Sequence, residues 1–280
     1  MNDRVIVLAV FMFSLSVVPC LSGQSIAAMT YNIRYINPND GENWWELRKD
    51  EVADLVNYYE PDFLGIQEGL YAQVTFIEDK CSKYDYIGVG RDDGKKKGEY
   101  TAVYFDKDKF ELLSQETFWL SPTPSKVSVG WDASMERICT YGHFKLKNSG
   151  TTVHIFNTHF DHKGPEARAN SAKLIVGKLK KLGIENDRII VMGDLNCLPE
   201  SEPIINFQTL LDDTALISPK PIYGPIGTFN RFDPQFIPHR RIDYIFSKNL
   251  QVLDHRIIDD RRKNNLWPSD HLPVLVRFEN

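Results

Sequence analysis

The chain has 280 residues, a formal net charge of -5 at pH 7 and 42% hydrophobic residues. This acidic balance excludes attachment to nucleic acid through bulk positive charge, although local basic patches stay open. The cysteines beyond residue 23 are Cys81, Cys139 and Cys197, an odd number that argues against a fold built on disulfides, and their spacing is not that of a zinc site. Residues 24–280 are long enough for one large core, so we expect a single domain.

Residues 1–23 have the pattern of a secretory signal peptide. One basic residue, Arg4, precedes an apolar run over residues 5–19 that is too short to cross a bilayer comfortably, and small residues follow. We therefore expect an exported protein, either periplasmic or secreted. Cys20 raises the alternative of a lipoprotein anchor, but Pro19 before it is a poor residue for that signal. An uncleaved membrane anchor is the other alternative.

The next part of the chain predicts a strand, a helix and a second strand. Residues 25–35 form an apolar run that gives way to Asn32, which alone fits a structural role better than a functional one. Residues 47–59 carry apolar side chains at spacings of three and four, which predicts an amphipathic helix. Residues 62–69 form a short strand that ends at Glu68.

A hairpin is predicted over residues 84–106, because two β-rich runs flank a turn that holds three lysines between glycines at residues 92–98. A solvated turn is the default interpretation of this charge run, and a rim that attracts phosphate is the alternative. We expect residues 118–131 to form an ordered loop anchored by Trp119 and Trp131.

The order of strand, helix and strand is then repeated. Residues 152–157 are rich in β-branched and aromatic side chains and lead to His159. A helix begins after Pro165 and ends at Gly183, which is a suitable residue for a C-terminal cap.

Residues 188–198, with the sequence RIIVMGDLNCL, begin as a short apolar run without helical period and end abruptly in polar residues. Gly193 permits a tight turn, and Asp194 and Asn196 follow at the strand end. From this stretch alone, a turn and a catalytic site are both open interpretations, because Asp and Asn commonly follow strands in turns.

The last part of the chain predicts a short helix over residues 207–216 and an aromatic loop after it. Residues 242–246 read as a strand in which Asp243 stands among apolar residues, a costly place for an acid unless it is partnered. Asp270 and His271 precede the closing strand.

The polar residues at these strand ends form one chemically consistent set. Its members are Asn32, Glu68, His159, Asp194, Asn196, Asp243, Asp270 and His271. Carboxylates and amides without cysteine suit a hard cation such as Mg²⁺ or Mn²⁺, and two histidines supply proton transfer or hydrogen bonds to a negative oxygen. Phosphate ester hydrolysis needs this combination, because the metal neutralises phosphoryl charge while a carboxylate orients or deprotonates water.

Six short blocks around these residues resemble the endonuclease/exonuclease/phosphatase superfamily and occur in its order. They read TYNIR, GIQEG, NTHFDH, GDLN, RIDYIF and SDHLPV. The sequence is most similar to exported bacterial members of the branch that includes the carbon-catabolite-repressor and nocturnin type deadenylases. The resemblance implies an α+β fold, a four-layer αββα sandwich of two mixed, mainly antiparallel sheets, as in DNase I.

The resemblance also implies a role for each residue of the set. Glu68 would be the principal ligand of Mg²⁺ (or Mn²⁺), with Asn32 beside it, and Asp270 would serve a second metal or the water on the first. Asp194 would position or activate the attacking water, and Asn196 would hold a phosphate oxygen.

The two histidines have separate implied roles. His271 would stabilise the pentavalent phosphorus transition state or act as acid and base, oriented by Asp243. His159 would contact the scissile phosphate, whereas His162 has no firm family role. Arg137 is a candidate phosphate contact, with a salt bridge or a surface role as the alternatives.

We expect an exported, divalent-metal-dependent phosphoesterase, in the first place a phosphodiesterase that acts on nucleic acid or nucleotides. The alternative is a phosphatase or phospholipase C-like hydrolase of a phosphorylated sugar, inositol or lipid headgroup. A non-catalytic binding protein is the least favoured interpretation, because every polar position expected of an active member is filled. We expect a monomer with no obligate protein partner.

Overall fold

The computed structural model describes residues 25–279, and the strands in this range form two six-stranded sheets. The first sheet contains, in spatial order, β11 (Gln251–Ile257), β12 (Val274–Glu279), β1 (Ile26–Asn32), β2 (Phe63–Gln67), β4 (Val103–Asp106) and β3 (Tyr84–Ile87). The second contains β5 (Phe110–Trp119), β6 (Ile138–Leu146), β7 (Thr152–His159), β8 (Ile189–Asp194), β10 (Asp243–Lys248) and β9 (Asp212–Asp213). The signal peptide predicted at residues 1–23 lies outside the described residues.

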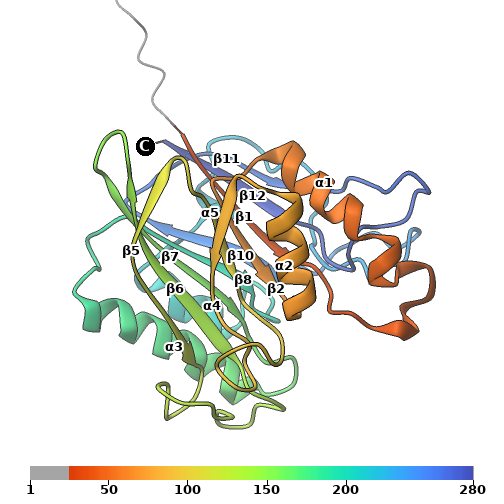
Figure 1. Ribbon diagram of the computed structural model, residues 1–280. Coiled ribbons are helices and arrows are strands. Elements are labelled where there is room, and N and C mark those ends of the chain that lie inside the picture. Colours follow the sequence, from red (N-terminus) through yellow and green to blue (C-terminus); the bar gives the residue numbers. More distant parts are fainter. Residues whose placement is uncertain (1–24, 280) are drawn as a thin grey trace, which may run out of the picture.

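The sheets pack face to face, and helices cover their outer faces (Figure 1). α1 (Lys49–Tyr59) and α2 (Tyr71–Lys80) cover the first sheet, whereas α3 (Pro165–Leu182) and α4 (Glu202–Gln208) cover the second. The short helices are η1 (Pro38–Asn43), η2 (Trp45–Leu47) and α5 (Thr214–Ile217). One hydrophobic cluster lies between the sheets and another lies under each helical layer. The predicted four-layer αββα sandwich is confirmed.

The central strands are apolar on both sides because both of their faces are covered. On β8, Ile190 and Met192 belong to the cluster between the sheets, whereas Ile189 and Val191 belong to the cluster under α3 and α4. A strand buried on both faces is a continuous apolar run rather than an alternating one. This is why the sequence of β8 predicts a strand without showing a period of two.

Each sheet contains one parallel pair, formed by a strand-helix-strand unit, and its other pairs are antiparallel. The first unit is β1-α1-β2, in which Asn32 pairs with Gln67. The second unit is β7-α3-β8, in which His159 pairs with Asp194. Both predicted units are confirmed, and their parallel strands bring the polar strand ends to one edge of the sandwich.

A buried polar network joins the two sheets beneath this edge. Gln67 Nε2 donates a hydrogen bond to Asn157 Oδ1 at 2.7 Å. Asn157 Nδ2 in turn donates to the carbonyl oxygens of Ile66 at 2.8 Å and Ala102 at 2.9 Å. Gly65 leaves room for this contact, since a Cβ there would lie 2.7 Å from Asn157 Cγ. The network fixes the first sheet against the second.

The helix expected over residues 207–216 is wrong in its position. α4 begins earlier, after Ser201, and carries a proline in its first turn, which is a favoured helix start. It ends at Gln208, and residues 212–213 then pair with β10 as β9. Arg241 Nη2 holds the Asp213 carboxylate at 2.7 Å, so this segment extends the sheet instead of the helix.

The loop expected over residues 118–131 begins later than expected, because Phe118 and Trp119 are the last residues of β5. Trp119 is buried and its Nε1 donates to the carbonyl oxygen of Arg91 at 2.8 Å, whereas Trp131 is half-buried. The cysteines at positions 81, 139 and 197 are free and buried. Across residues 25–279, no helix has the length and apolar character needed to span a membrane.

Candidate active site

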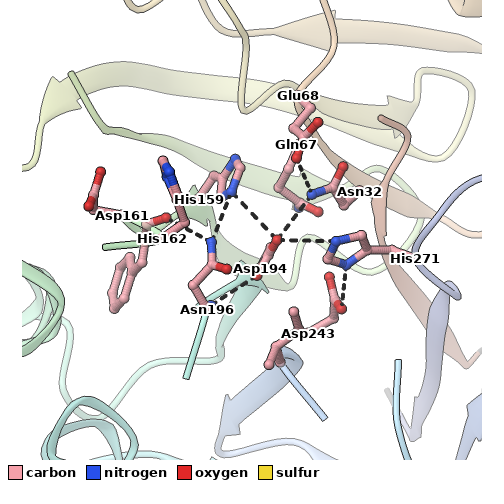
Figure 2. A network of polar contacts seen from close by, with 12 residues as sticks. Asn32, Gln67, Glu68, His159, Asp161, His162, Asp194, Asn196, Asp243 and His271 are labelled. Atoms are coloured by element: carbon pink, nitrogen blue, oxygen red, sulfur yellow. Dashed lines mark hydrogen bonds and ion pairs between the residues drawn. The ribbon is translucent and has the colours of Figure 1, made fainter. Parts of the chain in front are cut away.

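Asn32 connects the carboxylates that the two strand-helix-strand units bring together (Figure 2). Its Nδ2 donates to Glu68 Oε1 at 3.0 Å and to Asp194 Oδ2 at 3.0 Å. Its amide oxygen accepts the N–H of Arg34 at 3.0 Å, so the nitrogen of the amide faces the carboxylates. Ser269 Oγ donates to the Asn32 carbonyl oxygen at 2.7 Å and ties this strand end to the segment of Asp270.

The backbone turns sharply directly after the strands of the site. Glu68 has φ 63° and Asn196 has φ 50°, in the left-handed region that non-glycine residues rarely occupy. Such strain is typical of functional sites whose geometry is imposed by the surrounding fold. Gly193 has φ 148°, and a Cβ there would lie 1.9 Å from the carbonyl oxygen of Thr158, so only glycine is accommodated before Asp194.

His271 lies between two carboxylates. Its Nδ1 is 2.9 Å from Asp243 Oδ2, and its Nε2 is 3.7 Å from Asp194 Oδ2. Burial opposes protonation, but the charges of Asp243 and Asp194 hold the pKa of His271 well above 6.5. These charges favour the protonated ring, and the buried acid on β10 has a partner.

Asp194 is fully buried at the end of β8. Its Oδ1 accepts the N–H of Asn196 at 2.9 Å, while its Oδ2 accepts the Asn32 amide. Burial, followed by the negative charge of Asp243, raises the pKa of Asp194 to about 7. A carboxyl group with such a pKa takes up or releases a proton near neutral pH, as a general base must.

His159 is the neutral histidine of the site. Its Nε2 lies 3.2 Å from Asn196 Nδ2 and 3.5 Å from Asp194 Oδ2. Burial, followed by the positive charge of Arg137, holds the pKa of His159 well below 6.5. Asn196 Nδ2 also donates to the carbonyl oxygen of Phe160 at 3.1 Å. The site thus pairs a neutral histidine with a charged one, which gives the two rings different chemistry.

A cavity of about 500 Å³ lies over these residues. Glu68, Asp194 and Asp270 contribute carboxylates to its lining, whereas Asp243 lies behind His271 and does not line it. Burial, and the nearby charge of Glu68, raise the pKa of Asp270. Carboxylates that repel one another in a buried site are stabilised by a divalent cation, so this donor set fits Mg²⁺ or Mn²⁺.

A second group of ligand atoms lies next to the first. One ligand atom each from Asp194, Asp243 and His271 lies within 4.8 Å of the others. However, His271 Nδ1 is already hydrogen-bonded to Asp243, and the neighbouring carboxylates favour the protonated ring. A metal ligand must be deprotonated, so Glu68 and Asp270 are the better place for the cation.

Arg137 forms the salt bridge that was one of its alternatives, and the surface role is wrong because the side chain is buried; the phosphate contact stays a prediction. It is only 4% exposed and lines the cavity. Its Nε lies 3.4 Å from Asp161 Oδ2 and its Nη2 lies 3.0 Å from His162 Nδ1. Its remaining terminal nitrogen, Nη1, is buried without a hydrogen-bond partner.

Several lining residues were not expected from the sequence. They are Arg34, Tyr35, Arg91, Glu99, Met135, Phe229, Arg240 and Ile242. The predicted hairpin contained a signal for two of them, because closing it brings Arg91 N to within 3.1 Å of the Glu99 carbonyl oxygen. The lysines of that turn are exposed and do not line the cavity, in agreement with a solvated turn. Phe229 and Arg240 lie in an irregular segment that has no sequence period.

An αββα sandwich that gathers carboxylates, an amide and two histidines over one cavity provides what metal-assisted phosphoester hydrolysis requires. The sequence comparison leads to the same class, since residues 29–271 match the Endonuclease/Exonuclease/phosphatase family. The chain belongs to this family and is a phosphoesterase of the nuclease or phosphatase kind.

Two bacterial proteins of known structure are similar over almost the whole chain. The mannosyl-6-phosphatase of Bacteroides thetaiotaomicron is 37% identical, with a TM-score of 0.86 and coverage of 90% of this chain and 99% of that one. An endonuclease/exonuclease/phosphatase from Bacteroides vulgatus is 38% identical, with a TM-score of 0.86 and coverage of 91% and 99%.

A relative of the deadenylase type is similar at lower identity. The RNA exonuclease NGL1 of Saccharomyces cerevisiae is 20% identical, and the match covers 85% of each chain. The expected relationship to that branch is therefore confirmed, while the identity to the bacterial proteins is higher.

Proposed function

We propose that the protein is a divalent-metal-dependent phosphatase that releases phosphate from a sugar phosphate or a related polyol phosphate. The cavity of about 500 Å³ carries the proposal, because its carboxylates and its guanidinium and imidazole groups together bind a cation and a phosphate in a space of small-molecule size. The net charge of -5 gives no bulk attraction to nucleic acid. The 37% identity to a mannosyl-6-phosphatase supports the same choice.

A phosphodiesterase that acts on nucleic acid or nucleotides is the second candidate. A neighbouring cavity of about 350 Å³ shares Asn196 and Arg240 with the first, and Arg168 lines its far part. This space would accept the group on the other side of a phosphodiester. The similarity to an RNA exonuclease also favours this candidate.

Glu68 and Asp270 would hold Mg²⁺ or Mn²⁺, and Asn32 would keep the Glu68 carboxylate in position through its Nδ2 hydrogen bond. The bound ion would neutralise part of the negative charge on the phosphoryl group. The Tyr35 N–H donates to Glu68 Oε2 at 3.2 Å, which fixes the second oxygen of this carboxylate.

The other residues of the site bind the phosphate and move the proton. Asp194 accepts a proton from the attacking water as the water oxygen bonds to phosphorus and the ester P–O bond breaks, and solvent protonates the leaving alkoxide. The imidazolium of His271, held by Asp243, donates hydrogen bonds to the charge that develops on the phosphoryl oxygens. Asn196 and His159 bind a phosphate oxygen from the opposite side.

The test is hydrolysis by residues 24–280 of a panel that contains mannose 6-phosphate, bis-p-nitrophenyl phosphate and single-stranded RNA. We expect Mg²⁺-dependent release of inorganic phosphate from the sugar phosphate, abolished by EDTA and by Asp194→Asn. Preference for either diester would select the second candidate. Absence of hydrolysis across the panel with Mg²⁺ and Mn²⁺ would refute both.

Export is a separate proposal and rests on the sequence pattern of residues 1–23. Fractionation of cells that produce the full chain should recover a shortened protein outside the cytoplasm. Recovery of full-length protein in the cytoplasmic fraction alone would refute it.

A further inference from the structure

Arg91, Glu99 and Arg137 form one wall of the catalytic cavity, called here the charged wall. Arg91 Nη1 and Nη2 donate to the two oxygens of Glu99 at 2.6 and 2.9 Å, so the guanidinium holds the carboxylate in a fixed plane. Glu99 Oε2 lies 3.9 Å from His159 Nδ1. The charged wall therefore lies directly beside the place proposed for the phosphate.

The backbone holds the charged wall as firmly as its side chains do. Arg91 N donates to the Glu99 carbonyl oxygen at 3.1 Å, and the Arg91 carbonyl oxygen accepts the Trp119 indole. The Arg137 carbonyl oxygen accepts the N–H of Leu120 at 2.7 Å. The Trp119 contact joins the hairpin of the first sheet to the second sheet, so the wall has a preformed geometry before any ligand binds.

The charged wall contains donors that no protein atom satisfies. Arg137 Nη1 and Arg91 Nε are both buried without a hydrogen-bond partner. Arg137 is only 4% exposed, and it lines the cavity. A buried donor left without a partner is unfavourable, so this geometry is explained if a ligand supplies the acceptor.

The charge of the wall indicates which kind of ligand group it binds. Arg91 is neutralised by Glu99, and the Nε of Arg137 lies 3.4 Å from a carboxylate oxygen of Asp161. A second phosphate group on the substrate would need an excess of positive charge at the wall. The two arginines leave no such excess, because each lies beside a carboxylate. Neutral hydroxyl groups need one donor and one acceptor placed side by side, and an arginine next to a carboxylate offers both.

We propose that the charged wall binds hydroxyl groups of the sugar ring of the substrate, with the Glu99 carboxylate as acceptor and Arg137 Nη1 as donor. This inference rests on the proposed sugar phosphatase function and names the residues that select its substrate. Glu99 and Arg137 are thus specificity-determining residues, while Arg91 positions Glu99 through the paired hydrogen bonds.

The experiment compares mannose 6-phosphate, its monodeoxy analogues and p-nitrophenyl phosphate as substrates of the Mg²⁺-loaded full chain. A site built to bond a hydroxyl discriminates against an analogue that lacks it. We expect the wild-type protein to lose about 10-fold to 100-fold in kcat/KM on at least one analogue, the range of a charge-assisted hydrogen bond. Glu99→Gln and Arg137→Lys should reduce kcat/KM for the complete sugar by a similar factor and remove the discrimination.

The aryl phosphate separates a role in recognition from a role in folding or catalysis. It has no sugar hydroxyls, so in Glu99→Gln its kcat/KM should stay within about 3-fold of the wild-type value, because only a hydroxyl contact is lost. For Arg137→Lys the readout is the ratio of kcat/KM for the sugar phosphate to kcat/KM for the aryl phosphate, which should fall. Lys97→Ala is the matched control, because it removes an exposed side chain from the turn that leads to Glu99. It should leave kcat/KM unchanged for both substrates. Thermal unfolding of each variant would check that the fold is intact.

Two results would overturn the inference while leaving the phosphatase function standing. One is an equal loss on the aryl phosphate and the sugar phosphate in both variants. The other is a wild-type protein that hydrolyses the sugar phosphate and all of its deoxy analogues equally well. A wild-type protein that hydrolyses only diesters would instead refute the phosphatase function, and the inference with it.

Discussion

The two strand-helix-strand units reach the same edge of the sandwich, but they hold the loop after their first strand by opposite means. After β1, the fully buried guanidinium of Arg48 donates to backbone carbonyl oxygens. Its four hydrogen bonds reach Ile33 at 2.7 Å, Asn43 at 2.7 Å, Arg34 at 2.8 Å and Pro268 at 3.0 Å. Burial lowers the pKa of Arg48 to about 10, so it stays charged at neutral pH.

After β7, the buried carboxylate of Asp161 has the role that the buried guanidinium of Arg48 has after β1. The Asp161 carboxylate accepts the N–H groups of Lys163 at 2.9 Å, Gly164 at 2.8 Å and Ser134 at 3.1 Å. Burial alone would raise its pKa, but these backbone hydrogen bonds hold the pKa of Asp161 well below its usual range.

The difference lies in how far each contact reaches along the chain. Arg48 ties the loop after β1 to Pro268, close to Asp270, so the proposed metal side of the site needs both ends of the domain in place. Asp161 bonds residues that lie nearer in sequence, so the phosphate side is organised within the part of the chain that forms the second sheet. Contacts between distant residues form late and are sensitive to loosening of the fold.

The largest predicted effect tests whether the metal and the attacking water are held by different units. Glu68→Ala should lower activity by about 10³-fold and weaken Mg²⁺ binding measured by calorimetry, because it removes the principal carboxylate ligand. Asp194→Asn should lower activity by a similar factor with nearly unchanged Mg²⁺ affinity. Equal losses of Mg²⁺ binding in the two variants would contradict the assignment of metal and water to different units.

His271→Ala tests the imidazolium. We expect turnover at saturating Mg²⁺ to fall by about 10²-fold to 10³-fold, the usual cost of losing a preorganised donor to a developing charge. The measurement is kcat over a range of Mg²⁺ concentrations. Wild-type turnover in this variant would remove His271 from the reaction.

Loss of the buried cation should be the largest effect on stability. Arg48→Met leaves several buried carbonyl oxygens without a donor, so we expect the free energy of unfolding to fall by about 3 kcal/mol or more. Urea denaturation would measure it. Lys173→Met is the matched control, because the Lys173 ion pair with Glu202 is exposed and should contribute less than about 1 kcal/mol.

Loss of the buried anion should cost less and act more locally. For Asp161→Asn we expect a decrease of about 2 kcal/mol in the free energy of unfolding, because an amide oxygen at the Oδ1 position still accepts the N–H groups of Lys163 and Gly164 while the contacts of Oδ2 are lost. Mg²⁺ affinity should be retained in this variant and reduced in Arg48→Met. A lower Mg²⁺ affinity in Asp161→Asn than in Arg48→Met would contradict the proposed difference between the two units.

The smallest effect concerns pH at the start of the second unit. Burial, followed by the charge of His143, lowers the pKa of His154 to about 4, although Asp187 opposes this. The unfolded histidine binds a proton near pH 6.5, so stability is complete above that pH and is lost as the pH falls toward 4. His154→Gln should flatten the fall of unfolding free energy between pH 7 and 4.5, and an unchanged slope would contradict this.

The sequence was sufficient wherever a strand is central. Ile189, Ile190 and Val191 predict β8 because both faces of that strand are buried, and Asp194 follows at its end. Edge strands carry less information, since five of the ten residues of β5 are exposed and residues 114–117 in it are all polar. α2 was not predicted because Val74 and Ile77 favour strands, and its first turn is stabilised by Gln73, whose Oε1 accepts the N–H of Leu70 at 3.1 Å.

The site was predictable where strand ends carry it, and it was not where loops do. Asn32, His159 and Asp194 end their strands and Glu68 directly follows one, so their meeting follows from the sheet order. Arg91 and Glu99 meet through the predicted hairpin, but Arg137 reaches them only because the edge of one sheet packs against the other, which no local sequence pattern records. Arg48 likewise precedes α1 without any sequence signal for a special role, and that role depends on a segment near the end of the chain.

The Gln67–Asn157 contact between the sheets also gives a way to measure how slowly the sandwich opens. Both side-chain amides are fully buried, and Asn157 Nδ2 bonds carbonyl oxygens of the first sheet. Their protons reach water only when the sheets separate, which exposes the whole central core. The side-chain amide of Asn157 should therefore exchange with deuterium at the rate of global unfolding, and it reports the lifetime of the closed molecule from a single atom.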